Sequence, residues 1–208
     1  MHLPSHFAET RVEVLQEALR NAGLATLVTT GPEGLDASQI PLLLLPEPAP
    51  LGRLLGHVAR PNQQWRSTPE GSDALAIVLG ADAYVTPSWY PSKRETGRVV
   101  PTWNYVAIHV HGTVRFFQER DRLLDVVTRL TARYERGRSQ PWSVADAPRE
   151  YLEGMLGGIV GVELTITRIE GKWKASQNKG DSERQGVEEG LRSEGLEEMA
   201  DIVRDRGK

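Results

Sequence analysis

Four polar, aromatic segments carry most of the chemistry that this sequence offers. They span residues 57–66, 87–93, 100–105 and 170–179, and they contain four of the five tryptophans together with hydroxyls, amides and cationic side chains. Aromatic faces stack on flat rings, and cations and hydroxyls pair with a phosphate group, which carries about −1.5 to −2 charges. The segments would therefore suit a planar heterocycle with a phosphate tail.

The residues available to a phosphate share positive charge or a hydroxyl group. They are Arg60, Lys93, Lys172 and Lys174, with Ser88 or Ser92. A structural interpretation stands beside this one, because tryptophan-rich turns can simply close the ends of a barrel. Pro91 and Pro101 can likewise be rigid turn residues. Residue types alone leave both interpretations open.

The elements that must position these segments are mostly short strands. Strands are expected over residues 24–30, 37–45, 52–59, 75–79 and 83–86, then a strand pair over 103–117 and a last strand over 159–170. A helix opens the fold and stops at Gly23, and two more helices are inserted at about 120–137 and 147–158. This order predicts a mainly β fold with added helices (α+β), a small barrel rather than an alternating βαβ sheet.

The last thirty residues differ from the rest in charge. The chain has 25 Lys and Arg against 28 Asp and Glu, and residues 179–208 hold 6 basic and 9 acidic side chains. We expect one domain over 1–178 and an acidic helical tail over 179–208. Gly186, Gly190 and Gly195 weaken a helix and favour two short helices in the tail.

Composition excludes several classes of protein. No cysteine is present, which removes disulfides, cysteine nucleophiles and cysteine-ligated metals. No apolar run approaches the roughly 20 residues of a spanning helix, and no signal peptide is read at the N-terminus. A cytoplasmic, non-membrane protein is expected. No glycine-rich dinucleotide motif or Walker lysine motif appears.

Five blocks of the sequence resemble one known family, the PaiB-type FMN-binding negative transcriptional regulators. The blocks are residues 4–7 (PSHF), 57–66 (HVARPNQQWR), 87–93 (PSWYPSK), 100–105 (VPTWNY) and 172–178 (KWKASQN). The resemblance covers about residues 1–195, and several blocks in the same order make it specific. It implies an FMN-binding split β-barrel of the Greek-key type, similar to the pyridoxamine-phosphate oxidase and flavin-reductase barrels. It also implies a homodimer with flavin sites at the subunit interface.

The matched blocks supply the candidate cofactor-binding residues. These are His57, Arg60, Asn62, Ser88, Trp89, Tyr90, Lys93, Thr102, Trp103, Asn104, Lys174, Gln177 and Asn178. Arg60, Asn62, Lys93 and Ser88 are assigned to the phosphate and the ribityl chain. Trp89, Tyr90 and Trp103 are assigned to the flavin ring. Lys174, Gln177 and Asn178 are expected to extend into the flavin site of the other subunit.

Three positions depart from the family pattern. A small residue is expected where Pro61 stands, and proline removes a backbone N–H that could serve a phosphate. Leucine is expected where Ala175 stands, and arginine where Lys179 stands. Lysine does not reproduce the bidentate hydrogen bonding of arginine to a phosphate. These departures bear on affinity rather than on fold.

Three histidines raise the question of a metal or haem. His109 and His111 share one face of a predicted strand, and His57 lies in a matched block. No cysteine and no carboxylate close in sequence complete a ligand set, so no metal site is predicted. A haem-binding split barrel is kept as a less favoured alternative. Ser88 has no nucleophile-elbow glycines around it, so no hydrolase triad is predicted and no catalytic residue is assigned.

Arginines along the helix at about 120–137 raise the question of DNA. Arg122, Arg129, Arg133 and Arg136 fall on one face, but Asp125 sits among them and can pair with its neighbours. We therefore favour a solvated face over a phosphate-binding one, and the family resemblance alone keeps DNA as a possible partner. The leading hypothesis is an FMN-binding homodimer that senses redox state or runs a flavin-dependent reaction. The alternative is a non-enzymatic transcriptional regulator that binds DNA or a partner protein without flavin.

Overall fold

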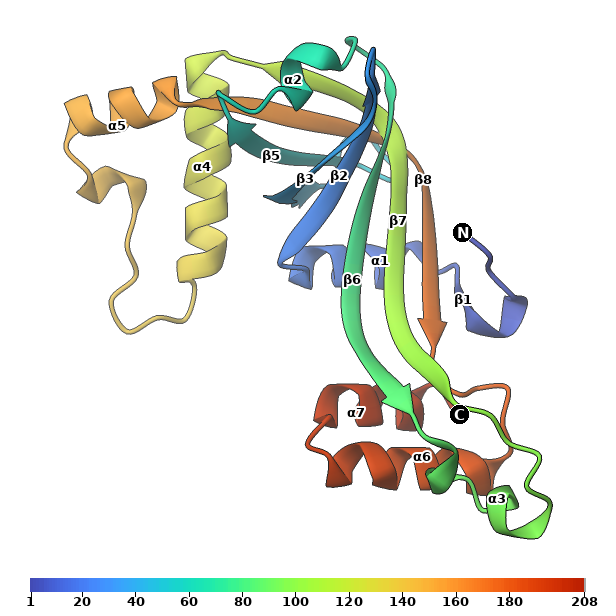
Figure 1. Ribbon diagram of the computed structural model, residues 1–208. Helices are drawn as coiled ribbons and strands as arrows, with labels where there is room; N and C mark the ends of the chain where they lie inside the picture. The colour runs from blue at the N-terminus through green and yellow to red at the C-terminus, as the bar shows by residue number, and fades with distance from the viewer. Residues whose placement is uncertain (208) are drawn as a thin grey trace. The chain divides into compact units, whose positions relative to one another are not determined.

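The computed structural model describes residues 1–207 of the chain. In this range eight strands form one sheet with the order β3-β2-β6-β7-β8-β5-β4, and β1 pairs with β8 (Figure 1). The strands are β1 (Ala8–Glu9), β2 (Leu24–Gly31), β3 (Gly34–Pro41), β4 (Leu43–Leu45), β5 (Arg53–Ala59), β6 (Asp73–Val85), β7 (Thr102–Phe117) and β8 (Ile159–Lys174). The helices are α1 (Val12–Asn21), α2 (Gln64–Ser67), α3 (Ser92–Glu95), α4 (Arg120–Glu135), α5 (Arg149–Gly157), α6 (Asp181–Ser193) and α7 (Glu197–Asp205). Short 3-10 turns are η1 (Ser5–Phe7), η2 (Pro87–Trp89) and η3 (Val144–Asp146).

The strand order is a Greek key. Strands β6, β7 and β8 are consecutive in the chain and lie side by side in the sheet. Strand β5, which precedes β6 in the chain, pairs antiparallel with β8, with His57 opposite Gly161. Strands β2 and β3 form a hairpin that closes at Gly31 and Gly34. The predicted class, mainly β with added helices, is confirmed. Over the described residues the sheet is not closed into a full barrel, because β3 and β4 are the two ends of the order.

Three expected strand divisions are wrong. The run 37–45 is two strands, β3 and β4, which are separated at Leu42. Glycine is the reason for the other two. The runs 75–79 and 83–86 are one continuous strand, β6, which passes through Gly80; a Cβ there would lie 3.0 Å from Val106 Cβ. The expected strand pair over 103–117 is one strand, β7, which passes through Gly112; a Cβ there would lie 2.1 Å from the carbonyl oxygen of Thr165. Each glycine permits the close approach of a neighbouring strand and does not form a turn.

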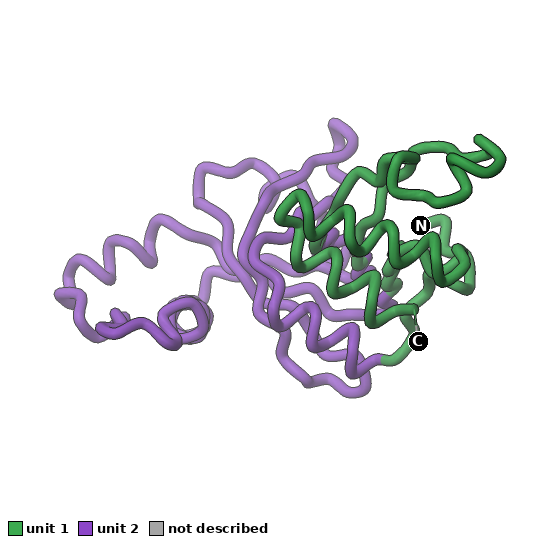
Figure 2. The backbone as a smooth tube through the Cα atoms, turned by 90° about the horizontal axis from the view of Figure 1, so that it is seen from below, with its two compact units in different colours: residues 1–11, 79–108, 170–208 green, residues 12–78, 109–169 purple. Residues whose placement is uncertain are grey.

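The chain divides into two compact units, coloured separately in Figure 2. Unit 1 contains Met1–Arg11, Leu79–Ile108 and the chain from Glu170 onward; unit 2 contains Val12–Val78 and His109–Ile169. Strands β6, β7 and β8 contribute residues to both. The predicted boundary between residues 178 and 179 stays a prediction.

Unit 2 has its own core beneath α4. This helix buries Leu123, Val126 and Leu130, which follow the helical spacing, and they cluster with Leu55 and Phe117 from the strands. The helix boundaries agree with the expected insertions at about 120–137 and 147–158.

The C-terminal helices build the core of unit 1. Val187 and Leu191 of α6 and Met199 and Val203 of α7 are buried together with Tyr90. The two short helices expected in the tail are confirmed, and Gly195 ends the first of them with a φ of +76°. Residues 181–205 therefore contribute apolar packing to unit 1.

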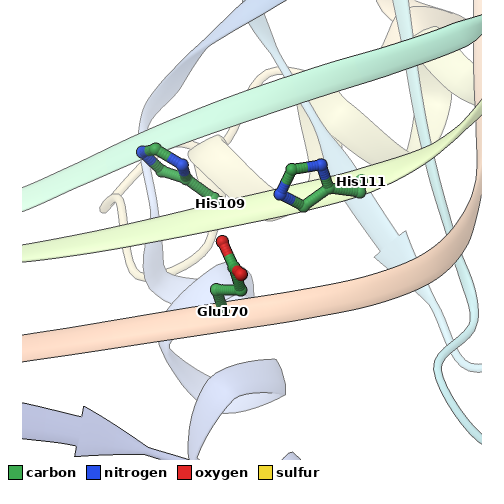
Figure 3. Close-up of side chains that lie close together, drawn as sticks. All are labelled: His109, His111 and Glu170. Atoms are coloured by element: carbon green, nitrogen blue, oxygen red, sulfur yellow. The ribbon is translucent and has the colours of Figure 1, made fainter. Parts of the chain in front are cut away.

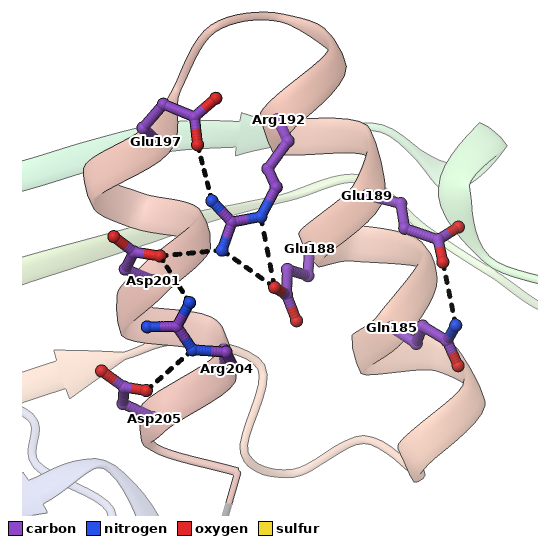
Figure 4. A network of polar contacts seen from close by, with 8 residues as sticks. All are labelled: Gln185, Glu188, Glu189, Arg192, Glu197, Asp201, Arg204 and Asp205. Carbon is purple, nitrogen blue, oxygen red and sulfur yellow. Dashed lines mark hydrogen bonds and ion pairs between the residues drawn. The ribbon is translucent and has the colours of Figure 1, made fainter.

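An ion-pair network joins the outer faces of α6 and α7 (Figure 4). Arg192 binds Glu188 (2.9 Å), Glu197 (2.5 Å) and Asp201 (2.7 Å), and Arg204 also binds Asp201 (2.9 Å). The hydrogen bonds that Arg192 donates to the carboxylates of Asp201, Glu188 and Glu197 raise its pKa above its usual value. Exposed pairs of this kind contribute little each, so the buried apolar face does most to hold the two helices together. Among residues 1–207, no helix has both the length and the apolar composition needed to cross a membrane.

Candidate functional site

The structure divides the predicted cofactor-binding residues between the two units. Unit 1 holds Ser88, Trp89, Tyr90, Lys93, Thr102, Trp103, Asn104, Lys174, Gln177 and Asn178. Unit 2 holds His57, Arg60 and Asn62. The candidate site is therefore described within unit 1.

A cavity of about 210 Å³ brings together many of these residues in unit 1. It is lined by Phe7, Tyr90, Val100, Pro101, Thr102, Asn104, Lys174, Ser176, Asn178 and Lys179. The loop before β7, the end of β8 and the turn that follows β8 supply most of this lining. The lining contains two lysines and no carboxylate, so it suits an anionic group.

Two lysines at the end of β8 and one in the turn that follows it each lie near an aromatic ring. The ammonium of Lys172 lies 5.1 Å from the centre of the Tyr105 ring, that of Lys174 lies 6.0 Å from Phe7, and that of Lys179 lies 5.1 Å from Tyr90. Burial lowers the pKa of Lys174, and the charges of Lys172 and Lys179 lower it further. Like charges held this close would be relieved by a bound anion.

Lys174 is also fixed by hydrogen bonds. Its ammonium donates to the hydroxyl oxygen of Thr102 (2.6 Å) and to the carbonyl oxygen of Trp103. An ammonium has three N–H donors, so one donor remains for a ligand. Thr102 and Lys174, two of the predicted cofactor-binding residues, are thus brought together at the start of β7.

Tyr90 lines this cavity, and its hydroxyl is buried in the core of unit 1. The residue is only 2% exposed, and its hydroxyl oxygen has no hydrogen-bond partner among the described residues. Burial raises the pKa of Tyr90, and the negative charge of Glu183 raises it further, so the phenol keeps its proton. A buried hydroxyl without a partner costs free energy, but this oxygen is fully buried in the core, so a ligand in the cavity does not reach it in this conformation.

The turn after β8 forms another part of the cavity lining. Asn104 donates to the hydroxyl of Ser176 (3.0 Å), and both side chains are buried. Ser176 has a φ of +63°, a left-handed conformation that is uncommon outside glycine. Gln177 accepts from the Ala175 N–H (2.7 Å) and donates to the Trp173 carbonyl (2.6 Å), so its amide closes the turn.

The remaining predicted residues of unit 1 lie outside the cavity lining. Trp103 is 54% exposed and makes an edge-to-face contact with Tyr84, with the ring centres 6.0 Å apart. Lys93 donates to the Ser88 hydroxyl (2.9 Å) at the surface. Trp89 packs on α6, where a Cβ at Gly190 would lie 2.2 Å from its ring. Trp89 therefore supports the structural interpretation of a tryptophan-rich turn.

In unit 2, Arg60 and Asn62 hold the local backbone. The guanidinium of Arg60 donates to the carbonyls of Gly157 (2.5 Å) and Ile159 (3.2 Å). Asn62 accepts from the N–H of Gln64 (2.9 Å) and donates to Ser38 (2.7 Å). Their assignment to a phosphate stays a prediction.

The histidines of unit 2 occupy strands. The Nδ1 of His57 is buried without a partner among the described residues, and burial lowers its pKa, so the ring is neutral near pH 7. His109 and His111 project from β7 with ring centres 6.4 Å apart (Figure 3). Glu170, also drawn there, belongs to unit 1, where it accepts from the amine of Met1 (2.8 Å).

The arginines of α4 are engaged within unit 2. Arg129 binds Asp125 (2.8 Å), as expected, whereas Arg122 binds Glu163 (3.1 Å). Arg133 donates to the carbonyl oxygens of Leu42 (2.9 Å) and Ala22. These partners agree with a solvated helix face.

Sequence reasoning missed five residues of the cavity lining. Four of them lie inside matched blocks but were not assigned to the cofactor: Phe7, Val100, Pro101 and Ser176. Lys179 stood out only as a departure from the family pattern, yet it lines the cavity and lies over Tyr90. Ser176 could not have been found from residue type, because its left-handed backbone is visible only in the fold.

Comparison with known proteins points to flavin binding. A family model described as "Putative FMN-binding domain" matches residues 1–168. The Bacillus subtilis protein named Protease synthase and sporulation protein PAI 2 is 31% identical over 211 residues, which cover 100% of this chain and 99% of that protein.

Two solved structures share the fold. A conserved hypothetical protein of Mycobacterium tuberculosis gives a TM-score of 0.58 at 14% identity and covers 86% of this chain and 94% of its own. The FAD and heme binding protein from Mycobacterium smegmatis gives a TM-score of 0.58 at 20% identity, and the match covers 80% of this chain and 73% of that protein.

The family match ends at residue 168, and the cavity at the start of β7 and the end of β8 adds the two ammonium groups of Lys174 and Lys179. These groups fit the phosphate and carbonyl acceptors of a flavin mononucleotide. By its family model, its full-length relative and its split-barrel fold, the chain belongs to the FMN-binding domain family that includes the PaiB-type proteins, and FMN is the cofactor of that family.

Proposed function

We propose that this protein is a homodimeric flavoprotein that binds FMN at the cavity of unit 1 and uses it for redox sensing or for a flavin-dependent reaction. The observation that carries the proposal is the cavity lined by Lys174 and Lys179 and by no carboxylate, where Thr102 holds the ammonium of Lys174 in place. When bound, the flavin would supply the electron or hydride transfer. The protein would supply binding, orientation and positive charge.

The size of the cavity supports a second copy of the chain at the site. Its volume of about 210 Å³ is below the roughly 300–1,000 Å³ of pockets that enclose a small molecule. Trp103 and Tyr84 are each about half exposed, and Val100 is 73% exposed, so unit 1 offers an uncovered apolar surface. In this proposal the partner covers that surface and completes the flavin site.

The side chains of unit 1 have separate roles in the proposal. Trp103 and Tyr84 offer aromatic faces to the ring, and Asn178 offers an amide at the cavity. Lys174, held by Thr102, keeps a fixed positive charge beside the ligand. A positive charge near a flavin favours its reduced, anionic form, so the same lysine would also adjust the reduction potential.

The test is to purify the protein without added cofactor and record its visible absorption spectrum and its mass in solution. A flavin spectrum, FMN released on denaturation and a dimeric mass are the expected results. A colourless protein that also fails to bind added FMN would reject the cofactor proposal for this chain. A Soret band would instead indicate haem, for which the buried His57 is the first residue to replace.

A regulator that binds DNA without flavin is the competing function. The ion pairs of Arg122 and Arg129 with Glu163 and Asp125 argue against a free basic face on α4. DNA binding would appear as a mobility shift that weakens steeply with salt, because phosphate contacts release counterions. A shift of that kind by flavin-free protein would favour the regulator.

A further inference from the structure

We propose that a cavity in unit 2, between α1, β4 and α4, binds a small organic anion that has an apolar body. The cavity has a volume of about 800 Å³, which lies within the roughly 300–1,000 Å³ of pockets that enclose a small molecule. All of its lining residues belong to unit 2. The proposal therefore concerns a second site and does not depend on flavin binding in unit 1.

Guanidinium groups outnumber carboxylates in the lining of this cavity. The guanidiniums are those of Arg20, Arg129, Arg133 and Arg136. Glu17 is the one acidic residue of the lining, and it pairs with Arg20 (2.8 Å). Arg129 pairs with Asp125 (2.8 Å), which lies outside the lining. The charges of Arg133 and Arg136 have no carboxylate partner within residues 1–207, so the cavity attracts an anion.

Arg133 is held in place by groups that do not neutralise it. Its guanidinium donates to the carbonyl oxygens of Leu42 (2.9 Å) and Ala22, and it lies 5.0 Å from the centre of the Tyr134 ring. These bonds have a structural role, because they join α4 to the segments that follow α1 and precede β4. Both acceptors are nevertheless uncharged, and a guanidinium has five N–H donors. Donors of Arg133 therefore remain for an anionic ligand.

Arg136 is the more available of the two cations. It directly follows α4, its side chain is exposed, and it has no hydrogen-bond acceptor or ion-pair partner in the described part of the chain. Arg129, on the same helix, shows the usual behaviour of a solvated arginine by pairing with a carboxylate four residues away. Arg136 has no such local partner and can pair with a carboxylate, sulfonate or phosphate of a ligand.

The apolar part of the lining determines the kind of anion. Strand β4 contributes Leu43, Leu44 and Leu45, and α4 contributes Ala132 and the 43% exposed ring of Tyr134. A simple inorganic anion would leave these groups in contact with water, whereas an aromatic or aliphatic body would cover them and gain free energy from their burial. Apolar groups beside fixed cations thus favour an organic anion over free phosphate.

The experiment uses anilinonaphthalene sulfonate (ANS), an aromatic anion whose fluorescence rises when it leaves water. Phenylnaphthylamine has the same aromatic body without the sulfonate and serves as the uncharged probe. Dissociation constants of both probes are measured by fluorescence titration of the full chain. The proteins are the wild type, Ala132→Glu, Ala132→Gln, Arg136→Met and the control Arg149→Met, which removes an exposed cation from α5.

Ala132→Glu places a carboxylate among the guanidiniums. Ala132 is exposed on α4, and glutamate is a good helix former, so the fold should persist. This variant should bind ANS at least about tenfold more weakly, and Arg136→Met about 3- to 10-fold more weakly. Ala132→Gln and Arg149→Met should stay within about twofold of the wild type, because distant or absent charges contribute little. The uncharged probe should bind all five proteins alike.

Two kinds of result would overturn the proposal. If the wild type shows no saturable ANS binding, or if either Ala132→Glu or Arg136→Met keeps the wild-type affinity, the anion does not bind at this cavity. If Ala132→Gln weakens ANS as much as Ala132→Glu, or if the uncharged probe loses as much affinity as ANS, the guanidiniums do not recognise the anion. Should circular dichroism show that Ala132→Glu is unfolded, Arg136→Met decides, because its side chain makes no bond within the described residues.

Discussion

The glycine at position 186 gives the sharpest test of how unit 1 is built. Gly186 lies in α6 and faces η2, the turn that leads into Tyr90. A Cβ at this position would lie 2.1 Å from the carbonyl oxygen of Trp89, and real Cβ contacts essentially never fall below 3.0 Å. Because the contact is with backbone, side-chain rotation does not relieve it. Gly186→Ala should therefore displace Trp89 and Tyr90 together.

The magnitude follows from two opposing effects. Alanine is better than glycine in a helix by about 1 kcal/mol, and forcing a group into a packed contact costs about 1–3 kcal/mol. The net result is a loss of up to about 2 kcal/mol in the free energy of unfolding. Gly154 of α5 is the matched control, because a Cβ there meets nothing within 4 Å. Gly154→Ala should gain about 0.5–1 kcal/mol.

Urea denaturation of both variants measures this difference, and an FMN titration follows the effect on the site. Gly186→Ala should be less stable than the wild type and should bind FMN more weakly, whereas Gly154→Ala should be more stable and bind FMN normally. Equal stabilisation of both variants would refute the contact between α6 and η2. Normal FMN binding by a destabilised Gly186→Ala would show that Tyr90 does not need this support.

Three further predictions concern polar side chains that bond to other parts of the fold. Glu9 is almost fully buried; the hydrogen bond from Arg11, together with that from Arg206, lowers its pKa from 4.5 to about 2. Its ion pair should stabilise the fold fully above pH 4.5 and be lost as the pH falls towards 2. Glu9→Gln should lower the free energy of unfolding at pH 7 by up to about 3 kcal/mol, and by less than this because solvent screens the exposed guanidinium of Arg11. It should also flatten the fall in stability at acid pH. A fall in stability at acid pH that is unchanged in the variant would contradict the ion pair. Asn104→Ala removes the partner of buried Ser176 and should cost about 1–3 kcal/mol in urea denaturation; a cost near zero would mean that the pair is not formed. Arg60→Ala should lower the urea midpoint, since each lost bond to the carbonyls of α5 and β8 is worth about 1 kcal/mol; an unchanged midpoint together with weaker FMN binding would return Arg60 to its predicted role at the phosphate.

The element order was predictable because hydrophobic periodicity and turn residues record it locally. The helices over 120–135 and 149–157 and the two tail helices follow from spacing and from stop signals such as Gly195. Glycines within strands were not predictable. Gly80 and Gly112 look like breaks in sequence, and only the approach of a neighbouring strand explains them.

The candidate site was predictable only in part. Residue type and the matched blocks pointed to Tyr90, Thr102, Asn104, Lys174 and Asn178, which the structure brings to one cavity. They could not separate side chains that face a ligand from those that hold the backbone. The amide of Gln177 closes a turn, and this depends on a backbone path that sequence does not reveal.

The most direct test of the account is the equilibrium dissociation constant for FMN of Lys174→Met against the wild type. Methionine keeps the long apolar stem and removes only the ammonium group at the cavity. Arg149→Met, which removes an exposed cation from α5, is the control for net charge. The account predicts that Lys174→Met binds FMN at least about tenfold more weakly while Arg149→Met binds it normally. Equal FMN affinity in all three proteins would contradict a flavin site at the cavity of unit 1.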